Sequence, residues 1–222
     1  MDFEFWENCW QRDSQPFHVA QAHSLLLKHF RENFNPDEKI LVPLSGKTVD
    51  TLFLAKQGFY SVAVEFNPTA VQKFFVENHL DPDEKVVELG SKNDIAKLFQ
   101  LTNIDIWQAD FFALHKEVVG QFRQVYDRAS FVALPIELRQ KFAQHLQSLL
   151  LPDSVILMIT MDYDPNQMSG PPFHVTQQEL ELCFPTATIS EIDRVCLMDN
   201  HPRWKELDLD YLDEVLYLIQ IP

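Results

Sequence analysis

Short apolar segments alternate with longer stretches of helical periodicity along most of this 222-residue chain, and this alternation constrains its fold more than any other feature. Almost continuously apolar segments such as 155–161 are typical of strands buried on both faces of a parallel sheet. The stretches between them predict crossover helices. With 46% apolar and 23% charged residues, the composition is close to the globular average. We therefore predict one α/β domain over residues 1–222.

The clearest element is a helix that begins after Asn67. Asn67 can cap it, Pro68 suits its first turn, and Ala70, Val71 and Phe74 start an apolar stripe. The other elements of the regular part are strands at 39–43, 61–65, 104–108, 124–126 and 155–161, and helices at 49–57, where Gly58 can form a left-handed cap, and at 137–150.

Two regions depart from the alternation. Between residues 79 and 103 we expect a strand at 86–89 and a short helix around 94–99. Near the end, Thr176 and Glu179 have the capping-box spacing for one more helix. The segments 188–193 and 214–220 follow with no long helix between them, so they predict a terminal antiparallel hairpin.

Charge, cysteines and hydropathy exclude several classes of protein. The net charge of −15 would repel a phosphate backbone, so we expect no nucleic-acid partner. The three distant cysteines predict free thiols in a reducing compartment. The acidic N-terminus lacks a signal-peptide pattern, and no apolar run approaches the about 18 residues of a membrane span. We expect a cytoplasmic monomer with no membrane contact and, since its histidines lack ligand spacing, no metal.

The loop at 43–48 reads Pro-Leu-Ser-Gly-Lys-Thr. It is not a phosphate-binding loop, because Leu41 stands where another glycine is required, five residues before Gly46. It also lacks the three spaced glycines of a dinucleotide-binding turn. Glu65 ends the next predicted strand about 20 residues later, where an acid can bind both ribose hydroxyls. The pattern favours an adenosine ligand without phosphate, although a solvated acid at a strand end is the alternative for Glu65.

Further strand ends carry side chains that suit such a ligand. Asp110 and Phe111 could offer a carboxylate and a ring to an adenine, although a phenylalanine there is equally typical of the core. Arg128 needs an anionic partner, which is either a local acid such as Asp127 or the carboxylate of a ligand. The aromatic residues before the first strand predict an amphipathic helix over the sheet, and their rings would also suit a sulfonium cation.

Several segments together resemble the thiopurine S-methyltransferase family. They run in order over nearly the whole chain, and the Pro-Leu-x-Gly-Lys and Gly-Pro-Pro-Phe loops are the most specific. Ser45 stands where the family usually has cysteine, a nearly isosteric change. The matching segments are Phe5-Trp6 with Trp10, Phe17-His18, Val42 to Lys47, Val64-Glu65, Tyr126-Asp127-Arg128, Tyr163-Asp164 and Gly170 to Phe173.

The resemblance implies a class I methyltransferase fold, a Rossmann-like, mostly parallel seven-stranded sheet with an antiparallel last strand and helices on both faces. It also implies methyl transfer from S-adenosyl-L-methionine, leaving S-adenosyl-L-homocysteine, to an aromatic or heterocyclic thiol such as a thiopurine, and in bacterial members to selenium or tellurium species. Residues 1–36 would form an aromatic cap over the cofactor. The implied cofactor residues are Trp6, Trp10, Leu44, Gly46, Glu65, Asp110, Phe111 and Arg128, and the implied acceptor residues are Phe17, Pro172, Phe173 and Arg203.

The mechanism expected from this resemblance is direct displacement by an acceptor thiolate, in which the protein mainly positions the reactants. No residue need act as a covalent nucleophile, and Arg128 or Arg203 could favour the anionic acceptor electrostatically. Two alternatives stay open at this stage. They are a methyltransferase for halide or small inorganic thiols, and a non-catalytic module that binds an adenosine ligand.

Overall fold

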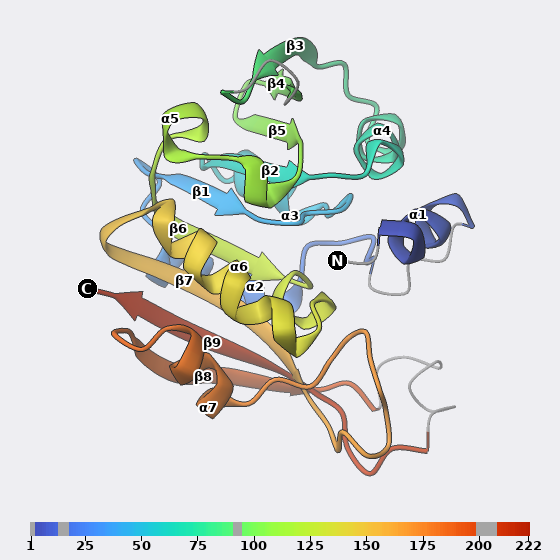
Figure 1. Cartoon of the computed structure of the whole chain (residues 1–222), viewed down its shortest axis with the longest axis vertical. Helices are drawn as coiled ribbons and strands as arrows, with labels where there is room; N and C mark the ends of the chain where they lie inside the picture. Colours follow the sequence, from blue (N-terminus) through green and yellow to red (C-terminus); the bar gives the residue numbers. More distant parts are fainter. Residues whose placement is uncertain (1–2, 13–17, 91–94, 199–207) are drawn as a thin grey trace.

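The computed structural model describes residues 3–12, 18–90, 95–198 and 208–222. Within these ranges nine strands form a single sheet, with helices on both faces (Figure 1). The strands are β1 (Lys39–Val42), β2 (Tyr60–Glu65), β3 (Asp83–Glu88), β4 (Ile95–Leu101), β5 (Ile104–Gln108), β6 (Phe122–Arg128), β7 (Leu150–Asp162), β8 (Thr188–Cys196) and β9 (Asp213–Ile221). The α-helices are α1 (Phe3–Gln11), α2 (Ser24–Asn33), α3 (Asp50–Lys56), α4 (Pro68–Glu77), α5 (Lys116–Val119), α6 (Ile136–Ser148) and α7 (Gln177–Cys183), and the 3₁₀ helices are η1 (Phe111–Ala113) and η2 (Phe131–Ala133).

The strand order is β3-β4-β5-β2-β1-β6-β7-β9-β8. The five strands from β5 to β7 are parallel, which agrees with their nearly unbroken apolar sequences. β9 runs antiparallel to both β7 and β8. The predicted terminal hairpin is therefore confirmed, and the seven strands from β5 to β8 have the expected reversed last strand. The strand order changes direction at β1 and β6, where ligands bind in open α/β sheets.

The expectations for residues 79–103 are only partly correct. The strand expected at 86–89 is β3, and it begins three residues earlier, at Asp83. The helix expected around 94–99 is wrong, because Ile95–Leu101 forms β4, antiparallel to β3 and β5. Alternate residues such as Ala96 and Leu98 are buried, which is the period of a strand. This hairpin extends the expected seven-stranded sheet to nine strands.

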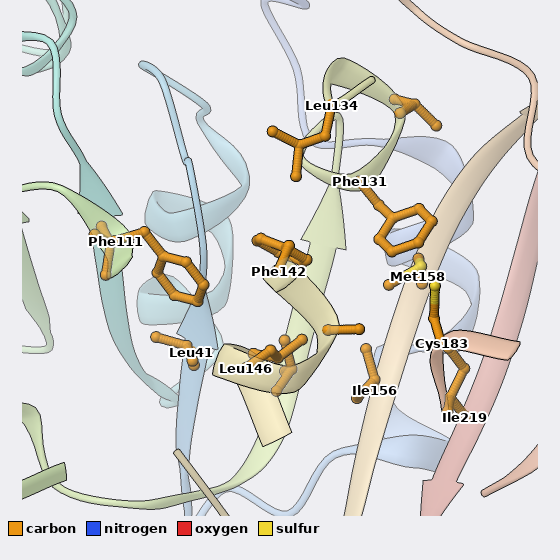
Figure 2. Close-up of a cluster of buried hydrophobic side chains, with 14 of the residues drawn as sticks. Leu41, Phe111, Phe131, Leu134, Phe142, Leu146, Ile156, Met158, Cys183 and Ile219 are labelled. Carbon is orange, nitrogen blue, oxygen red and sulfur yellow. The ribbon is translucent and has the colours of Figure 1, made fainter. Parts of the chain in front are cut away.

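Hydrophobic clusters on the two faces of the sheet hold the helices in place. One cluster contains side chains of α2, α3 and α4, and the other contains side chains of η1, α6 and α7. In the second cluster, drawn in Figure 2, Phe111 points toward Phe142 of α6, and their ring centroids are 5.1 Å apart. Both residues are fully or almost fully buried. Each would contribute about 1.5–3 kcal/mol through removal of its apolar surface from water.

The helix caps predicted at Asn67 and Thr176 are both present in the structure. The Asn67 side chain accepts hydrogen bonds from the N–H groups of Thr69 and Ala70, as predicted. Thr176 caps α7 by accepting from the N–H of Glu179. The Glu179 carboxylate, however, accepts a 2.7 Å bond from the buried Arg139. A buried guanidinium needs a carboxylate more than an exposed helix start does, which explains this arrangement.

Candidate active site

A cavity of about 310 Å³ opens at the carboxyl ends of β1, β2, β6 and β7. It reaches from α1 across the sheet to the beginning of β9. Seven residues that the sequence predicts for the site line this cavity: Trp6, Trp10, Leu44, Gly46, Glu65, Arg128 and Pro172. The structure thus brings seven of the predicted site residues together, from segments far apart in the sequence.

The Glu65 carboxylate organises one end of the cavity. One oxygen accepts a 2.7 Å bond from the N–H of Gly46, and the other accepts a 2.8 Å bond from the N–H of Asn67. Burial raises the pKa of Glu65 to about 7, against the opposing effect of these bonds and of the Phe66 N–H. Glu65 therefore links the loop after β1 to the start of α4.

The loop after β1 makes a close turn beneath α1. Leu44 and Gly46 have φ angles of 42° and 55°, in the left-handed region that favours glycine. A Cβ atom on Gly46 would lie 3.2 Å from the Trp10 indole ring. The absence of a side chain at Gly46 therefore allows the indole to lie against the loop backbone.

Helix α1 is held in place by polar contacts with α4. The Asn67 amide donates a 2.6 Å bond to the Glu7 carboxylate, and the Lys73 ammonium donates a 2.8 Å bond to the Trp10 carbonyl. Figure 1 shows α1 beside α4, outside the layers that cover the sheet. These contacts place Trp6 and Trp10 on the cavity wall, next to the loop that contains Gly46.

Lys47, the lysine of the Gly-Lys-Thr sequence, is largely buried and bonds to Glu77 at the end of α4. Its ammonium lies 2.6 and 2.9 Å from the two carboxylate oxygens. In a phosphate-binding loop the corresponding lysine reaches the ligand's phosphates. Here its charge is already balanced by a carboxylate, which agrees with the phosphate-free ligand inferred from the sequence.

Arg128, unlike Lys47, has no carboxylate partner among the residues that the structure describes. It ends β6 and lines the cavity, and no ion pair within 4.0 Å joins it to any residue that the structure describes. The neighbouring Asp127 points elsewhere, because its carboxylate accepts 3.2 Å bonds from the N–H groups of Ser130 and Phe131. Asp127 is therefore not the ion-pair partner of Arg128.

The far end of the cavity is shaped by a loop after β7 and by the start of β9. Pro171 and Pro172 line it. The Tyr163 hydroxyl fixes this loop by donating to the Pro172 carbonyl and accepting from the His174 N–H, both at 2.8 Å. Glu214, at the start of β9, also lines this end.

The remaining predicted site residues lie elsewhere. Asp110 is exposed at the carboxyl end of β5, where its side chain caps η1. Phe111 lies in the core, so the ring expected to face an adenine packs against α6 instead. Phe173 does not line the cavity and lies 5.7 Å from the Arg139 guanidinium. Phe17 and Arg203 lie outside the described residues.

His23 and Glu214 also line the cavity, although neither was among the residues predicted for the site. They lie 191 positions apart and are joined by a 2.9 Å contact. His23 also caps α2, where its side chain accepts a hydrogen bond from the Leu25 N–H. No local motif indicates the pairing, because it depends on the position of β9 in the sheet.

Comparison with known proteins identifies the family. The family described as thiopurine S-methyltransferase matches residues 1–221. The chain belongs to the thiopurine S-methyltransferase family. A thiopurine S-methyltransferase from Pseudomonas aeruginosa is 36% identical over 222 residues, and the alignment covers 99% of this chain and 99% of that protein. One from Vibrio atlanticus is 33% identical over 218 residues, covering 98% of this chain and 97% of its own.

Solved structures agree on the fold. A SAM-dependent methyltransferase from Anabaena variabilis has a TM-score of 0.69 at 17% identity, covering 99% of this chain and 94% of its own. An N-methyltransferase from Bradyrhizobium japonicum in complex with S-adenosyl-L-homocysteine has a TM-score of 0.60 at 12% identity, covering 96% and 91%. Family membership and fold together make this chain an S-adenosylmethionine-dependent methyltransferase.

Membrane-spanning helices, metal-binding clusters and disulfides are all absent from the described residues. No helix among them is long and apolar enough to cross a membrane. They also contain no group of three or more histidine, cysteine, aspartate or glutamate side chains arranged to hold a metal ion. The three cysteines form no disulfide.

Proposed function

We propose that this member of the thiopurine S-methyltransferase family binds S-adenosyl-L-methionine in the cavity and methylates small aromatic or heterocyclic thiols, thiopurines among them. The observation that carries the proposal is the single cavity that joins Glu65, Arg128 and the Pro171-Pro172 loop. It offers the Glu65 carboxylate at one end, and at the other an apolar wall of Val132, Ala133 and Pro172 beside the His23–Glu214 pair.

The residues present suit the cofactor. Glu65 lies where its carboxylate can accept hydrogen bonds from ribose hydroxyls, and Gly46, which has no Cβ atom, lets the Trp10 indole pack against the loop. Arg128 has no ion pair among the described residues, so its guanidinium is available to a carboxylate. The proposed cofactor set is Trp6, Trp10, Leu44, Gly46, Glu65, Arg128 and, at the rim, Asp110. Residues 1–36 would cap this end through Trp6 and Trp10.

The bound cofactor supplies a methyl group on a positively charged sulfur. The chain's own residues therefore need to orient two reactants and exclude water rather than form a covalent bond. The indole rings of Trp6 and Trp10 suit a sulfonium cation electrostatically. Val132, Ala133 and Pro172 would bound the acceptor on its apolar sides.

Calorimetric titration with S-adenosyl-L-homocysteine tests the cofactor site. Arg128→Met should weaken binding about 10- to 100-fold, the loss expected for one charge-assisted hydrogen bond. Arg123→Met is the matched control, because Arg123 lies on β6 at the opposite end of the strand. Equal affinities for wild type and Arg128→Met would contradict the assignment.

A panel of acceptors tests the reaction. Wild-type protein with S-adenosyl-L-methionine should methylate thiophenols and thiopurines, and the panel should include a selenol, inorganic sulfide and iodide. Transfer only to sulfide or iodide would show a halide or small-thiol enzyme. Tight cofactor binding without transfer to any acceptor would show a binding module and refute the proposed reaction.

A further inference from the structure

Glu214 is a shielded carboxylate at the acceptor end of the cavity. It stands at the start of β9, opposite Met161 of β7, and its side chain keeps only 14% of its surface exposed. A carboxylate in such a position is costly unless donors or positive charges surround it. The hydrogen-bond donors and charges near Glu214 therefore decide whether it stays ionised and which of its oxygens can bind a ligand.

His23 holds one oxygen of Glu214. The His23 Nε2 lies 2.9 Å from Glu214 Oε2, and its Nδ1 accepts a bond from the Leu25 N–H. Because Nδ1 acts as an acceptor, the ring proton is on Nε2 and is donated to Glu214. The His23 main-chain N–H also donates a 2.8 Å bond to Asp50. The imidazole is thus fixed at the start of α2, and it fixes Glu214 in turn.

The charges around Glu214 keep it ionised. Burial raises the pKa of Glu214, but the hydrogen bond from His23, the positive charge of His23 when its ring is protonated, and the charge of Arg128 together outweigh burial and leave the pKa below its usual value. Tyr126 is another titratable group whose pKa Glu214 influences. Burial and the charge of Asp50 raise the pKa of its hydroxyl well above the usual value, so Tyr126 adds no negative charge near Glu214. The neighbouring Asp213 carboxylate is occupied by Arg194, 3.0 Å away.

One oxygen of Glu214 remains for a ligand. No described residue forms a hydrogen bond with Oε1, while Oε2 bonds to His23. Arg128 acts on Glu214 through its charge without an ion pair within 4.0 Å among the described residues. Both side chains line the same cavity, so a ligand there can contact both.

We propose that Glu214 contacts the methyl acceptor and accepts its proton during transfer, with His23 as the positioning residue that holds it. This inference rests on the proposed function. It specifies acceptors that arrive uncharged, either as thiols or as the thioamide tautomers of nitrogen heterocycles. Such acceptors carry one proton, on sulfur or on a ring nitrogen, that must leave when sulfur is methylated.

The step balances in atoms and electrons. The S–H or N–H bond of the acceptor breaks, its proton moves to Glu214 Oε1, and the acceptor sulfur forms the new S–CH₃ bond. The electron pair of the broken methyl–sulfonium bond stays on the departing sulfur, which becomes a neutral thioether. A carboxylate is a weak base toward a free thiol, but the proton becomes much more acidic as the sulfur donates its electrons. An acceptor that is already a thiolate needs no such help.

Glu214→Gln tests the catalytic role with a series of ring-substituted thiophenols of different thiol pKa, at one pH. We expect kcat/KM to fall about 100-fold or more for the least acidic thiol, as for loss of a general base, and at most a few-fold for the most acidic. Glu88→Gln makes the same charge change on β3, where Glu88 is exposed, and should leave the whole series unchanged. A loss of equal size for all thiols would refute proton transfer to Glu214.

A spectroscopic titration tests the contact without turnover. A thiophenol whose absorbance differs between thiol and thiolate is bound in the presence of S-adenosyl-L-homocysteine, and its pKa is measured on the protein. Glu214→Gln should lower the pKa of the bound thiol by about one unit or more, because a neighbouring negative charge is removed. An unchanged pKa would show that Glu214 does not contact the acceptor.

His23→Asn tests positioning. Asparagine can still cap α2, but its shorter side chain does not reach Glu214. The lost hydrogen bond should raise the pKa of Glu214, so the acidic limb of the kcat/KM profile for a weakly acidic thiol should move to higher pH. A folded variant with an unmoved limb would refute the role of His23. Failure of the wild-type protein to bind S-adenosyl-L-homocysteine would instead refute the proposed function itself.

Discussion

If the ribose hydroxyls of the cofactor bind the Glu65 carboxylate as proposed, cofactor binding should release a proton near neutral pH. Burial raises the pKa of Glu65 to about 7 without ligand. Ribose hydroxyls that donate to the carboxylate favour its charged form and should return the pKa toward its usual value of 4.5. Affinity should therefore rise with pH up to about 7 and then level off.

The magnitude follows from the two pKa values. At pH 6 a group with a pKa of about 7 is about 90% protonated. The dissociation constant of S-adenosyl-L-homocysteine should therefore be about tenfold larger at pH 6 than at pH 8. At pH 7 the loss should be about twofold. Calorimetry at these three pH values, in buffers with different ionisation enthalpies, measures both the affinity and the number of protons released.

Glu65→Gln identifies the group responsible. The variant keeps the shape of the side chain but cannot titrate, so its weaker binding should be independent of pH from 6 to 8. This control matters because burial also raises the pKa of Asp127 to about 7. A pH dependence that survives in Glu65→Gln would assign the proton to another group, and a flat wild-type profile with no proton release would refute the reasoning.

Two further substitutions test the packing around the site. Gly46→Ala should weaken S-adenosyl-L-homocysteine binding and lower Tm, since left-handed backbone costs a non-glycine residue roughly 1–2 kcal/mol and the new Cβ would press on an indole ring. Gly58→Ala, with a positive φ but nothing within 4 Å, should lower Tm alone, and equal binding losses would contradict the contact argument. Tyr126→Phe removes the 2.9 Å bond to buried Asp50 and should cost about 1–3 kcal/mol in urea unfolding. An unchanged urea midpoint would show that Asp50 finds another donor.

The parts of the fold that local sequence determines were predicted correctly. The apolar run at 155–161 lies within β7, and Asn67 caps α4, because neither outcome needs information from distant residues. The β3–β4 hairpin was harder to predict. Ile95 to Leu101 mixes apolar and polar residues in a pattern that also allows a short helix, and pairing with β5 decides in favour of a strand.

In the candidate site, too, some residues could be predicted from local sequence and others depend on distant parts of the chain. Glu65 and the loop containing Gly46 were found from their spacing, because adjacent parallel strands bring their carboxyl ends together. Phe111 could not be placed from sequence, since the turn of η1 decides whether its ring faces the cavity or the core. Glu214 gave no signal at all, because only the insertion of β9 next to β7 brings it to His23.

The position of β9 also constrains how the protein is made. β9 follows β8 in the chain but lies between β7 and β8 in the sheet, so a ribosome has completed β8 before the strand that joins it to the rest exists. Until β9 emerges, β7 has an open edge, and open edges favour pairing with other chains. The nascent protein therefore carries this risk until β9 is synthesised. Because Glu214 lies on β9 and lines the cavity, the strand that closes this edge of the sheet also completes the cavity wall.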